Sequence, residues 1–166
     1  DLKALAPANL VVEAIVENLE IKQKLFRDLE EICKPDVVLA TNTSSISITA
    51  IGAALKRPER LIGMHFFNPA PILKLVKVIS GLATDPKIAD QISELSAYWG
   101  KHPVHARSTP GFIVNRVARP FYAEALRVLE EGATDVATID AVMRDCGRFR
   151  MGPFELMDLI GLDVNY

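Results

Sequence analysis

The sequence has few of the features that mark a secreted, membrane-bound or nucleic-acid-binding protein. Its 166 residues include only two cysteines, Cys33 and Cys146, without C-x-x-C spacing, which argues against a disulfide scaffold and a cysteine-based zinc site. No apolar run approaches the roughly 20 residues that a membrane helix needs. The net charge of -2 gives no electrostatic reason to expect a nucleic-acid partner. We expect both cysteines to fill core space as thiols in a reducing, intracellular compartment.

The two ends of the sequence lack the usual marks of a complete chain. The opening segment DLKALAPANLVVEAI has no initiating methionine, and no basic region precedes its apolar residues, so it is not typical of a signal peptide. The closing segment MDLIGLDVNY has no helix-ending signal at its terminus. We therefore expect an internal piece of a longer protein. Its 49% of hydrophobic residues predicts a packed core.

Metal binding is also not indicated. His102 and His105 lie three residues apart with Pro103 between them, on a segment expected to be extended. Side chains at odd spacing on a strand point to opposite faces, and no third ligand lies nearby in the sequence. We expect no metal site.

The first two-thirds of the chain alternates short apolar runs with helical patterns. Apolar runs typical of strands occupy residues 10–16, 37–40, 61–67, 75–80 and 103–106. The run 10–16 is typical of a strand that is buried on both faces. Apolar residues at helical spacing predict helices over 18–34, 48–55 and 84–100. This alternation predicts an α/β fold with a parallel sheet.

The pattern changes after Pro110-Gly111. Amphipathic helices are predicted over 114–132, 139–147 and 153–161, each ended by a glycine, and this part contains no strand signal. We place a domain boundary near Ser108. Residues 1–108 then form part of an α/β domain, and residues 109–166 form the first helices of an all-α domain.

Polar residues follow two of the predicted strands, where ligands bind in open α/β sheets. Asn42, Thr43, Ser44 and Ser45 come after the strand 37–40, and His65 and Asn68 end the strand 61–67. Histidine is the natural acid–base group near neutral pH. The structural alternatives are a hydrogen-bonded core histidine and a helix-capping loop. Asn115, in an apolar stretch, needs a hydrogen-bond partner or a substrate.

The combined motifs make the sequence similar to a known enzyme family. In order they are LVVEAIVENLEIKQKLF, ATNTSS, GMHFFNPAPILKLVKVI, GKHPV, TPGFIVNR and MGPFELMDLIGLD. The chain resembles the 3-hydroxyacyl-CoA dehydrogenases of fatty-acid and aromatic-acid degradation, over essentially its whole length. Within this family, the motifs are most similar to those of the bacterial 3-hydroxybutyryl- or 3-hydroxyadipyl-CoA dehydrogenase type.

The resemblance implies a Rossmann-like domain, an NAD cofactor and oxidation of the 3-hydroxyl of an acyl-CoA to a ketone. It makes His65 the general base, Ser44 the group that binds the substrate oxygen, and Asn115 the group that orients the thioester-side carbonyl. The residues that it assigns to the nicotinamide and ribose are Glu17, Lys22 and Asn68, with Asn42 close by. It further implies a homodimer and a bacterial cytosolic location.

Two departures from the family pattern bear on activity. The dinucleotide fingerprint G-x-G-x-x-G is absent from the sequence, so tight independent NAD binding is not expected. The family also places a glutamate in the segment KLVEVI, where it accepts a hydrogen bond from the catalytic histidine. This chain has Lys77 at that position. A charged lysine accepts no hydrogen bond and disfavours the imidazolium, which predicts severely impaired turnover.

Three interpretations therefore stay open. The first is an NAD-dependent 3-hydroxyacyl-CoA dehydrogenase, of which the isolated piece is inactive. The second is a dehydrogenase of the same superfamily that acts on a hydroxy acid without CoA. The third is a catalytically retired structural or binding relative, which the Lys77 substitution favours.

Overall fold

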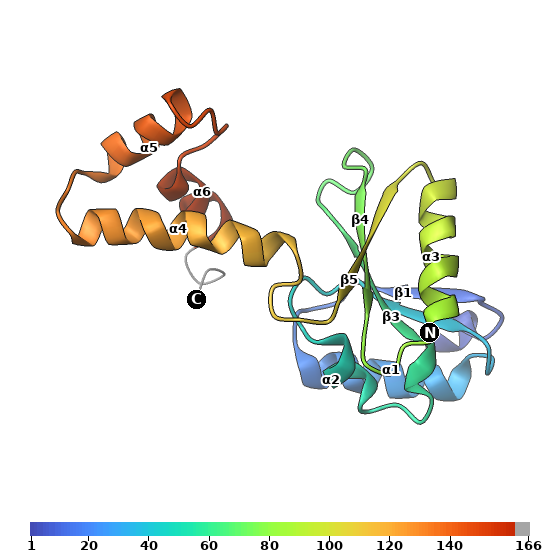
Figure 1. Cartoon of the computed structure of the whole chain (residues 1–166). Helices are drawn as coiled ribbons and strands as arrows, with labels where there is room; N and C mark the ends of the chain where they lie inside the picture. The colour runs from blue at the N-terminus through green and yellow to red at the C-terminus, as the bar shows by residue number, and fades with distance from the viewer. Residues whose placement is uncertain (162–166) are drawn as a thin grey trace. The chain divides into compact units, whose positions relative to one another are not determined.

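The computed structural model describes residues 1–161, and the chain divides into two compact units, 1–112 and 113–166 (Figure 1). The last residues of the MGPFELMDLIGLD motif, 162 and 163, lie outside the described residues. No helix within 1–161 is both long and apolar enough to span a membrane. The two units are described separately.

The first unit is built on a five-stranded sheet with the strand order β1-β2-β3-β4-β5. The strands are β1 (Leu10–Glu13), β2 (Val38–Thr41), β3 (Leu61–Phe66), β4 (Leu75–Ser80) and β5 (His102–Arg107). The helices are α1 (Leu19–Ile32), α2 (Ile48–Gly52) and α3 (Pro86–Tyr98), with 3₁₀ turns η1 (Leu2–Leu5) and η2 (Pro58–Arg60). This is the α/β, Rossmann-like order that the sequence predicts.

The sheet is parallel except at one strand. β1, β2 and β3 pair in parallel, β4 runs antiparallel to β3, and β5 is parallel to β4. The prediction of a wholly parallel sheet was wrong at β4. A parallel connection needs a crossover segment of a dozen or more residues, whereas the short loop 67–74 returns the chain directly beside β3.

β1 is shorter and more exposed than its sequence indicates. It ends at Glu13 rather than at Val16, and the Val12 side chain is 40% exposed. The prediction of burial on both faces was wrong because β1 is an edge strand of the sheet within the described residues. Ile15 and Val16, which follow it, are exposed.

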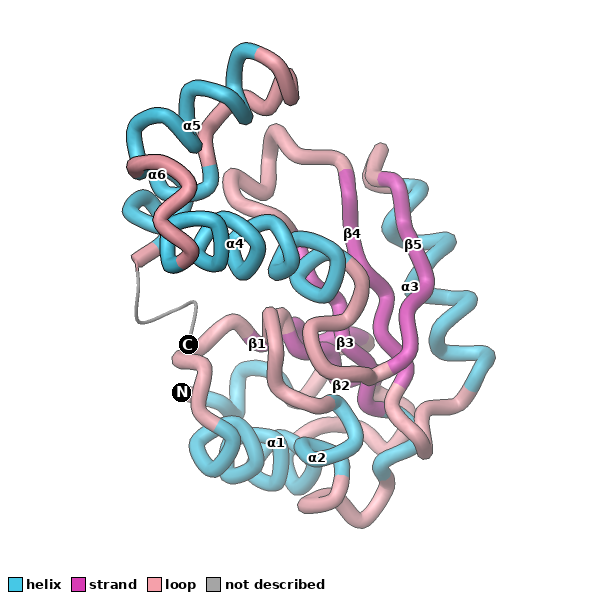
Figure 2. Tube along the Cα trace, turned by 60° about the vertical axis from the view of Figure 1, so that its left-hand side comes forward, coloured by secondary structure: helices cyan, strands magenta, loops and turns pink. Residues whose placement is uncertain are grey.

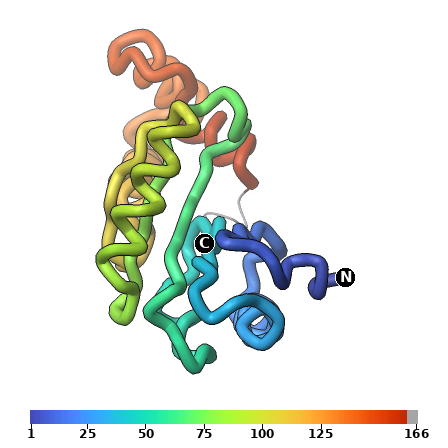
Figure 3. Tube along the Cα trace, turned by 90° about the vertical axis from the view of Figure 1, so that its right-hand side faces the viewer, coloured from blue at the N-terminus to red at the C-terminus, as the bar shows by residue number. Residues whose placement is uncertain are grey.

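Helices cover both faces of the sheet (Figures 2 and 3). On one face, Phe26 and Leu29 of α1 and Ile51 of α2 pack into a buried cluster with strand residues. On the other face, Ala89 and Ile92 of α3 pack against strand residues from β2, β3 and β4. Gly63 lets α2 approach β3, because a Cβ there would lie 2.8 Å from the Ile48 side chain. This close approach packs α2 directly against β3.

Helix starts follow their capping residues. Asn18 accepts a hydrogen bond from the Ile21 backbone at the start of α1, and Asp85 accepts one from Lys87 at the start of α3. Both starts agree with the sequence pattern to within two residues.

The second unit is helical over its described residues, as predicted. It contains α4 (Val114–Glu130), α5 (Val136–Asp145) and α6 (Pro153–Ile160). The buried Asp140 carboxylate of α5 accepts hydrogen bonds from the Phe154 and Glu155 backbones and so caps the start of α6. Cys33 is buried as expected, but the same expectation for Cys146 was wrong: it ends α5 and is exposed.

Candidate functional site

The polar residues that the sequence singles out gather at one edge of the first unit. Glu17 lies between β1 and α1, residues 42–45 follow β2, and His65 is near the end of β3. Because these three strands are neighbours and run in parallel, their carboxyl ends meet at the same edge. Ligands of open α/β sheets bind at such an edge.

The Glu17 carboxylate organises the loop after β2. Its Oε1 accepts hydrogen bonds from the Thr43 hydroxyl at 2.6 Å and from the Ser44 and Ser45 backbones at 2.8 and 3.0 Å. The hydroxyls of Ser44 and Ser45 donate to the same oxygen at 3.1 and 3.2 Å. Burial acts to raise the pKa of Glu17, but the hydrogen bonds from Thr43, Ser45 and Ser44 and the charge of Lys22 hold it below its usual value. Glu17 is therefore an anion that fixes Ser44 in place.

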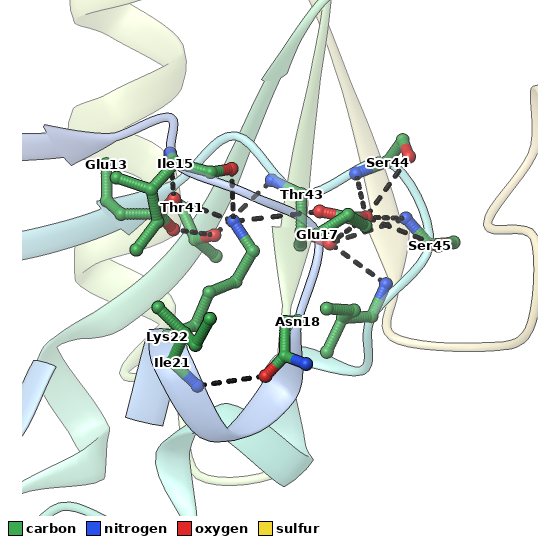
Figure 4. Close-up of polar contacts among 11 residues, drawn as sticks. Glu13, Ile15, Glu17, Asn18, Ile21, Lys22, Thr41, Thr43, Ser44 and Ser45 are labelled. Atoms are coloured by element: carbon green, nitrogen blue, oxygen red, sulfur yellow. Dashed lines mark hydrogen bonds and ion pairs between the residues drawn. The ribbon is translucent and has the colours of Figure 1, made fainter. Parts of the chain in front are cut away.

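Lys22 contacts this carboxylate from the interior of the unit. Its side chain is 1% exposed, and its Nζ lies 2.6 Å from Glu13 Oε1 and 3.6 Å from Glu17 Oε2. Glu13 Oε2 in turn accepts a hydrogen bond from the Thr41 hydroxyl at 2.7 Å. The chain of contacts joins β1, α1 and β2 (Figure 4). Lys22 is therefore an interior partner of Glu17 and Glu13 rather than a surface group.

Sequence reasoning missed Glu13 and Thr41 as parts of this network. The signal was available, since Glu13 is a carboxylate inside an otherwise apolar strand run, LVVEAIV. A buried carboxylate requires a cation or several donors. Thr43 was noted only as a member of the polar run, although it donates the shortest hydrogen bond to Glu17.

The two asparagines differ in their surroundings. Asn42 Oδ1 accepts a hydrogen bond from the Phe66 backbone at 2.8 Å and so ties the end of β2 to the end of β3, beside His65. Asn68 lies just beyond β3 and is exposed. Both therefore lie at the edge that the resemblance assigns to the cofactor.

His65 faces Lys77 across the antiparallel pair of β3 and β4. Burial, and then the positive charge of Lys77, lower the pKa of His65 to about 4, while the charge of Glu17 acts in the opposite direction. His65 is therefore a neutral imidazole at physiological pH. Burial also lowers the pKa of Lys77.

Asn115 belongs to the second unit. It is the second residue of α4 and is partly buried. In the same unit, an apolar groove of about 720 Å³ is lined mainly by α4 and the segment before α6, including Val117, Phe121 and Phe149. The role of Asn115 toward a substrate stays a prediction.

Together, the fold and the site define a class of protein: an α/β domain with a histidine and a carboxylate at the carboxyl edge of its sheet, followed by a helical unit, as in NAD-dependent dehydrogenases. The chain belongs to the 3-hydroxyacyl-CoA dehydrogenase family. Residues 1–109 match the NAD-binding domain of that family, and residues 111–166 match its C-terminal domain. The family resemblance is thereby confirmed, and NAD is the cofactor of the matched domain.

Named relatives agree with this assignment. The chain is 60% identical to 3-hydroxyadipyl-CoA dehydrogenase of Escherichia coli over all 166 residues, which are 35% of that protein. It is 48% identical to 3-hydroxybutyryl-CoA dehydrogenase of Clostridioides difficile over 94% of the chain and 56% of that protein. A crystal structure of 3-hydroxybutyryl-CoA dehydrogenase from Escherichia coli superposes with a TM-score of 0.96 and 60% identity, over 100% of this chain and 35% of that one. The chain thus spans between about a third and just over half of these relatives.

Proposed function

We propose that the complete protein oxidises the 3-hydroxyl of a 3-hydroxyacyl-CoA to a ketone, with NAD as the hydride acceptor. One observation carries the proposal. In a chain that matches both domains of the family, His65, Ser44 and Glu17 gather at the carboxyl edge of the sheet.

The chain's own residues have complementary parts in this reaction. His65 takes the proton of the substrate hydroxyl, which must leave as hydride departs from the same carbon. Five donors converge on Glu17 Oε1, more than its lone pairs hold well, so the Ser44 hydroxyl, at 3.1 Å, can turn to donate to the substrate oxygen. Asn115 orients the thioester-side carbonyl. These contacts align the substrate for the transfer.

The polar groups beside His65 suit the nicotinamide end of the cofactor. NAD, when bound, supplies the hydride acceptor. Glu17 Oε2, which is paired only loosely with Lys22 at 3.6 Å, can accept from a ribose hydroxyl. The Asn42 amide nitrogen and the exposed Asn68 offer donors for the carboxamide. The residues present thus fit one half of the dinucleotide, and the pyrophosphate requires a glycine-rich turn that the sequence does not contain.

The biological setting is part of the proposal. We place the activity in fatty-acid or aromatic-acid degradation in a bacterial cytosol, with an acyl-CoA as substrate. We also propose that the complete protein is a homodimer through its helical domain, where Val117 of α4, which lines the apolar groove, is 73% exposed. Light scattering of the complete protein tests this, and a monomeric mass would refute it.

A second candidate function rests on Lys77. A buried amine beside the histidine is the feature expected of a relative that has lost catalysis and keeps the fold for structural or binding purposes. A third, dehydrogenation of a hydroxy acid without CoA, uses the same catalytic groups and differs only in the substrate.

Formation of NADH by the complete protein separates these candidates. We expect slow oxidation of 3-hydroxybutyryl-CoA at neutral pH, and a rate higher by roughly 10²–10⁴-fold in Lys77→Glu. His65→Gln in the Lys77→Glu background serves as the control and should abolish the gain. If neither protein formed NADH, the chain would come from a relative that has lost catalysis. Faster turnover of free 3-hydroxybutyrate would establish the CoA-independent enzyme. Equal rates for the parent and Lys77→Glu would refute the impairment.

A further inference from the structure

Two buried polar atoms on opposite residues of β3 and β4 have no hydrogen-bond partner among the described residues. They are His65 Nδ1 and Lys77 Nζ. The two residues are directly opposite in the register of β3 and β4, so their Cβ atoms lie about 4.5–5.5 Å apart on one face of the sheet. The flexible stem of lysine puts its amine within reach of the ring.

The surroundings keep both atoms away from other partners. The Lys77 side chain is 1% exposed. Its Nζ lies 5.1 Å from the centroids of both the Phe67 and Phe112 rings. The Phe67 ring also packs edge-on against His65, with the centroids 5.0 Å apart. Aromatic rings attract a cation but offer no strong hydrogen bond, so the imidazole is the polar group left for the amine to meet.

The hydrogen-bonding role of the amine depends on its proton. An ammonium group only donates, whereas a neutral amine has a lone pair that accepts. A neutral imidazole carries one proton, on Nδ1 or on Nε2, and the nitrogen without it is the one that can act as a base. The partner of Nδ1 therefore decides whether Nε2 is free.

We propose that the protonation state of Lys77 selects the tautomer of His65. The Lys77 ammonium donates to Nδ1, which leaves the ring proton on Nε2. When Lys77 loses its proton to solvent, the ring releases its Nε2 proton to solvent and takes one up from solvent at Nδ1. The amine lone pair then accepts from Nδ1–H, and Nε2 is free. Electrostatics acts in the same direction, since an adjacent cation repels the positive end of an Nδ1–H bond.

The ring itself remains neutral while Lys77 titrates. With a pKa of about 4, lowered by burial and by Lys77 and opposed by Glu17, His65 has already lost its imidazolium proton at neutral pH. The β5 residue in register with Lys77 is the apolar Val104, and His102, two residues earlier on β5, is exposed. The tautomer is thus the property of His65 that changes above neutral pH.

The functional consequence rests on the proposed function. If His65 Nε2 is the base toward the substrate hydroxyl, Lys77 is a positioning residue that acts through His65. His65 can then act as a base only after Lys77 has lost its proton. Because burial lowers the pKa of Lys77, the active tautomer becomes populated at a lower pH than an exposed lysine would allow.

The test is a heteronuclear NMR titration of the chain with ¹⁵N-labelled histidine. Long-range proton–nitrogen correlations distinguish the two tautomers of each of the three histidines. We expect His65 to carry its proton on Nε2 at neutral pH and to change to Nδ1–H as the pH rises toward the usual lysine range. A tautomer that stays the same up to pH values about that of a free lysine, ~10.4, would overturn the proposal.

Two variants make the result specific. In Lys77→Met, which keeps the length of the side chain, the tautomer of His65 should no longer respond to pH. In Lys77→Glu, the carboxylate should hold the Nδ1–H form at neutral pH. A tautomer change that persists unaltered in Lys77→Met would contradict the proposal. Since the readout is spectroscopic, it is independent of turnover. A tautomer change in the chain together with no NADH formation by the complete protein, as the parent or as Lys77→Glu, would refute the proposed function alone.

Discussion

At the scale of single residues, Lys77 makes a prediction about stability. Its buried ammonium has three donors, of which the proposed contact with His65 Nδ1 satisfies one, and leaving the others unsatisfied among the described residues costs about 1–3 kcal/mol. We expect Lys77→Met to raise the free energy of unfolding by about that amount at neutral pH, as measured by urea denaturation.

The pH dependence of this gain has a definite sign. The pKa of Lys77 is lowered in the folded chain, so the unfolded chain binds more protons between the folded and unfolded pKa values. The stability of the parent chain then rises with pH through that window, and the advantage of Lys77→Met shrinks. The exposed Lys74 provides a matched control, since Lys74→Met should change little at any pH. An advantage that stays constant or grows with pH would contradict the account.

The same residue shows what sequence could and could not supply. The sequence predicts the bounds of β3 and β4 closely, and the family resemblance placed position 77 beside His65. The antiparallel register that sets the two residues opposite each other was not predicted. The orphaned Nδ1 and Nζ atoms could not be predicted, because they depend on how Phe67 and Phe112 pack around the amine. Such packing is a property of the folded interior and leaves no pattern in the sequence.

At the scale of elements, the network of Glu13, Lys22 and Thr41 joins β1 and β2 to α1. Removing one partner of a buried ion pair leaves an uncompensated charge and costs about 3–5 kcal/mol. We expect Lys22→Met to lower the free energy of unfolding by that amount, because Glu13 loses its cation at 2.6 Å. The measurement is again urea denaturation.

α1 itself offers the matched control. Lys24 is exposed on the same helix, so Lys24→Met makes the same chemical change without breaking a buried pair. It should alter stability by no more than about 0.5 kcal/mol. Similar losses in the two variants would show that the effect comes from the helix surface rather than from the network.

Elements were predicted well where the pattern was local and poorly where it depended on neighbours. The α1 start at Asn18, the bounds of β4 and the length of α6 follow from capping residues, apolar runs and terminal glycines. The antiparallel direction of β4 depends on the short loop before it. The exposure of β1 depends on its place at the edge of the sheet. Apolar content alone does not distinguish an edge strand from a central one.

At the scale of the whole molecule, the two family domains are joined in one chain. The residues of this chain suit only one half of a dinucleotide, the nicotinamide and its ribose. The described site has the polar groups that we propose as contacts of the nicotinamide and ribose. It has no glycine-rich turn for the pyrophosphate, since the sequence contains no G-x-G-x-x-G. Family membership therefore establishes which cofactor the domain binds, whereas the affinity of these 166 residues for it is a separate question.

Calorimetry with NAD and with nicotinamide mononucleotide answers that question. Two charge-assisted hydrogen bonds to a pyrophosphate contribute about 3–6 kcal/mol, so we expect the 166-residue chain to bind NAD more weakly than the complete protein by roughly 100-fold or more. Nicotinamide mononucleotide lacks the adenosine half, and it should bind both proteins with affinities within a few-fold of each other.

Glu17→Gln should lower the affinity of both proteins for the mononucleotide, because Glu17 orders the loop that follows β2. Equal affinity of both proteins for NAD would mean that most of the binding energy comes from the nicotinamide end, which would contradict the expected difference of roughly 100-fold. If the mononucleotide bound the complete protein but not the 166-residue chain, the carboxyl edge of the sheet would need further residues to form the nicotinamide site.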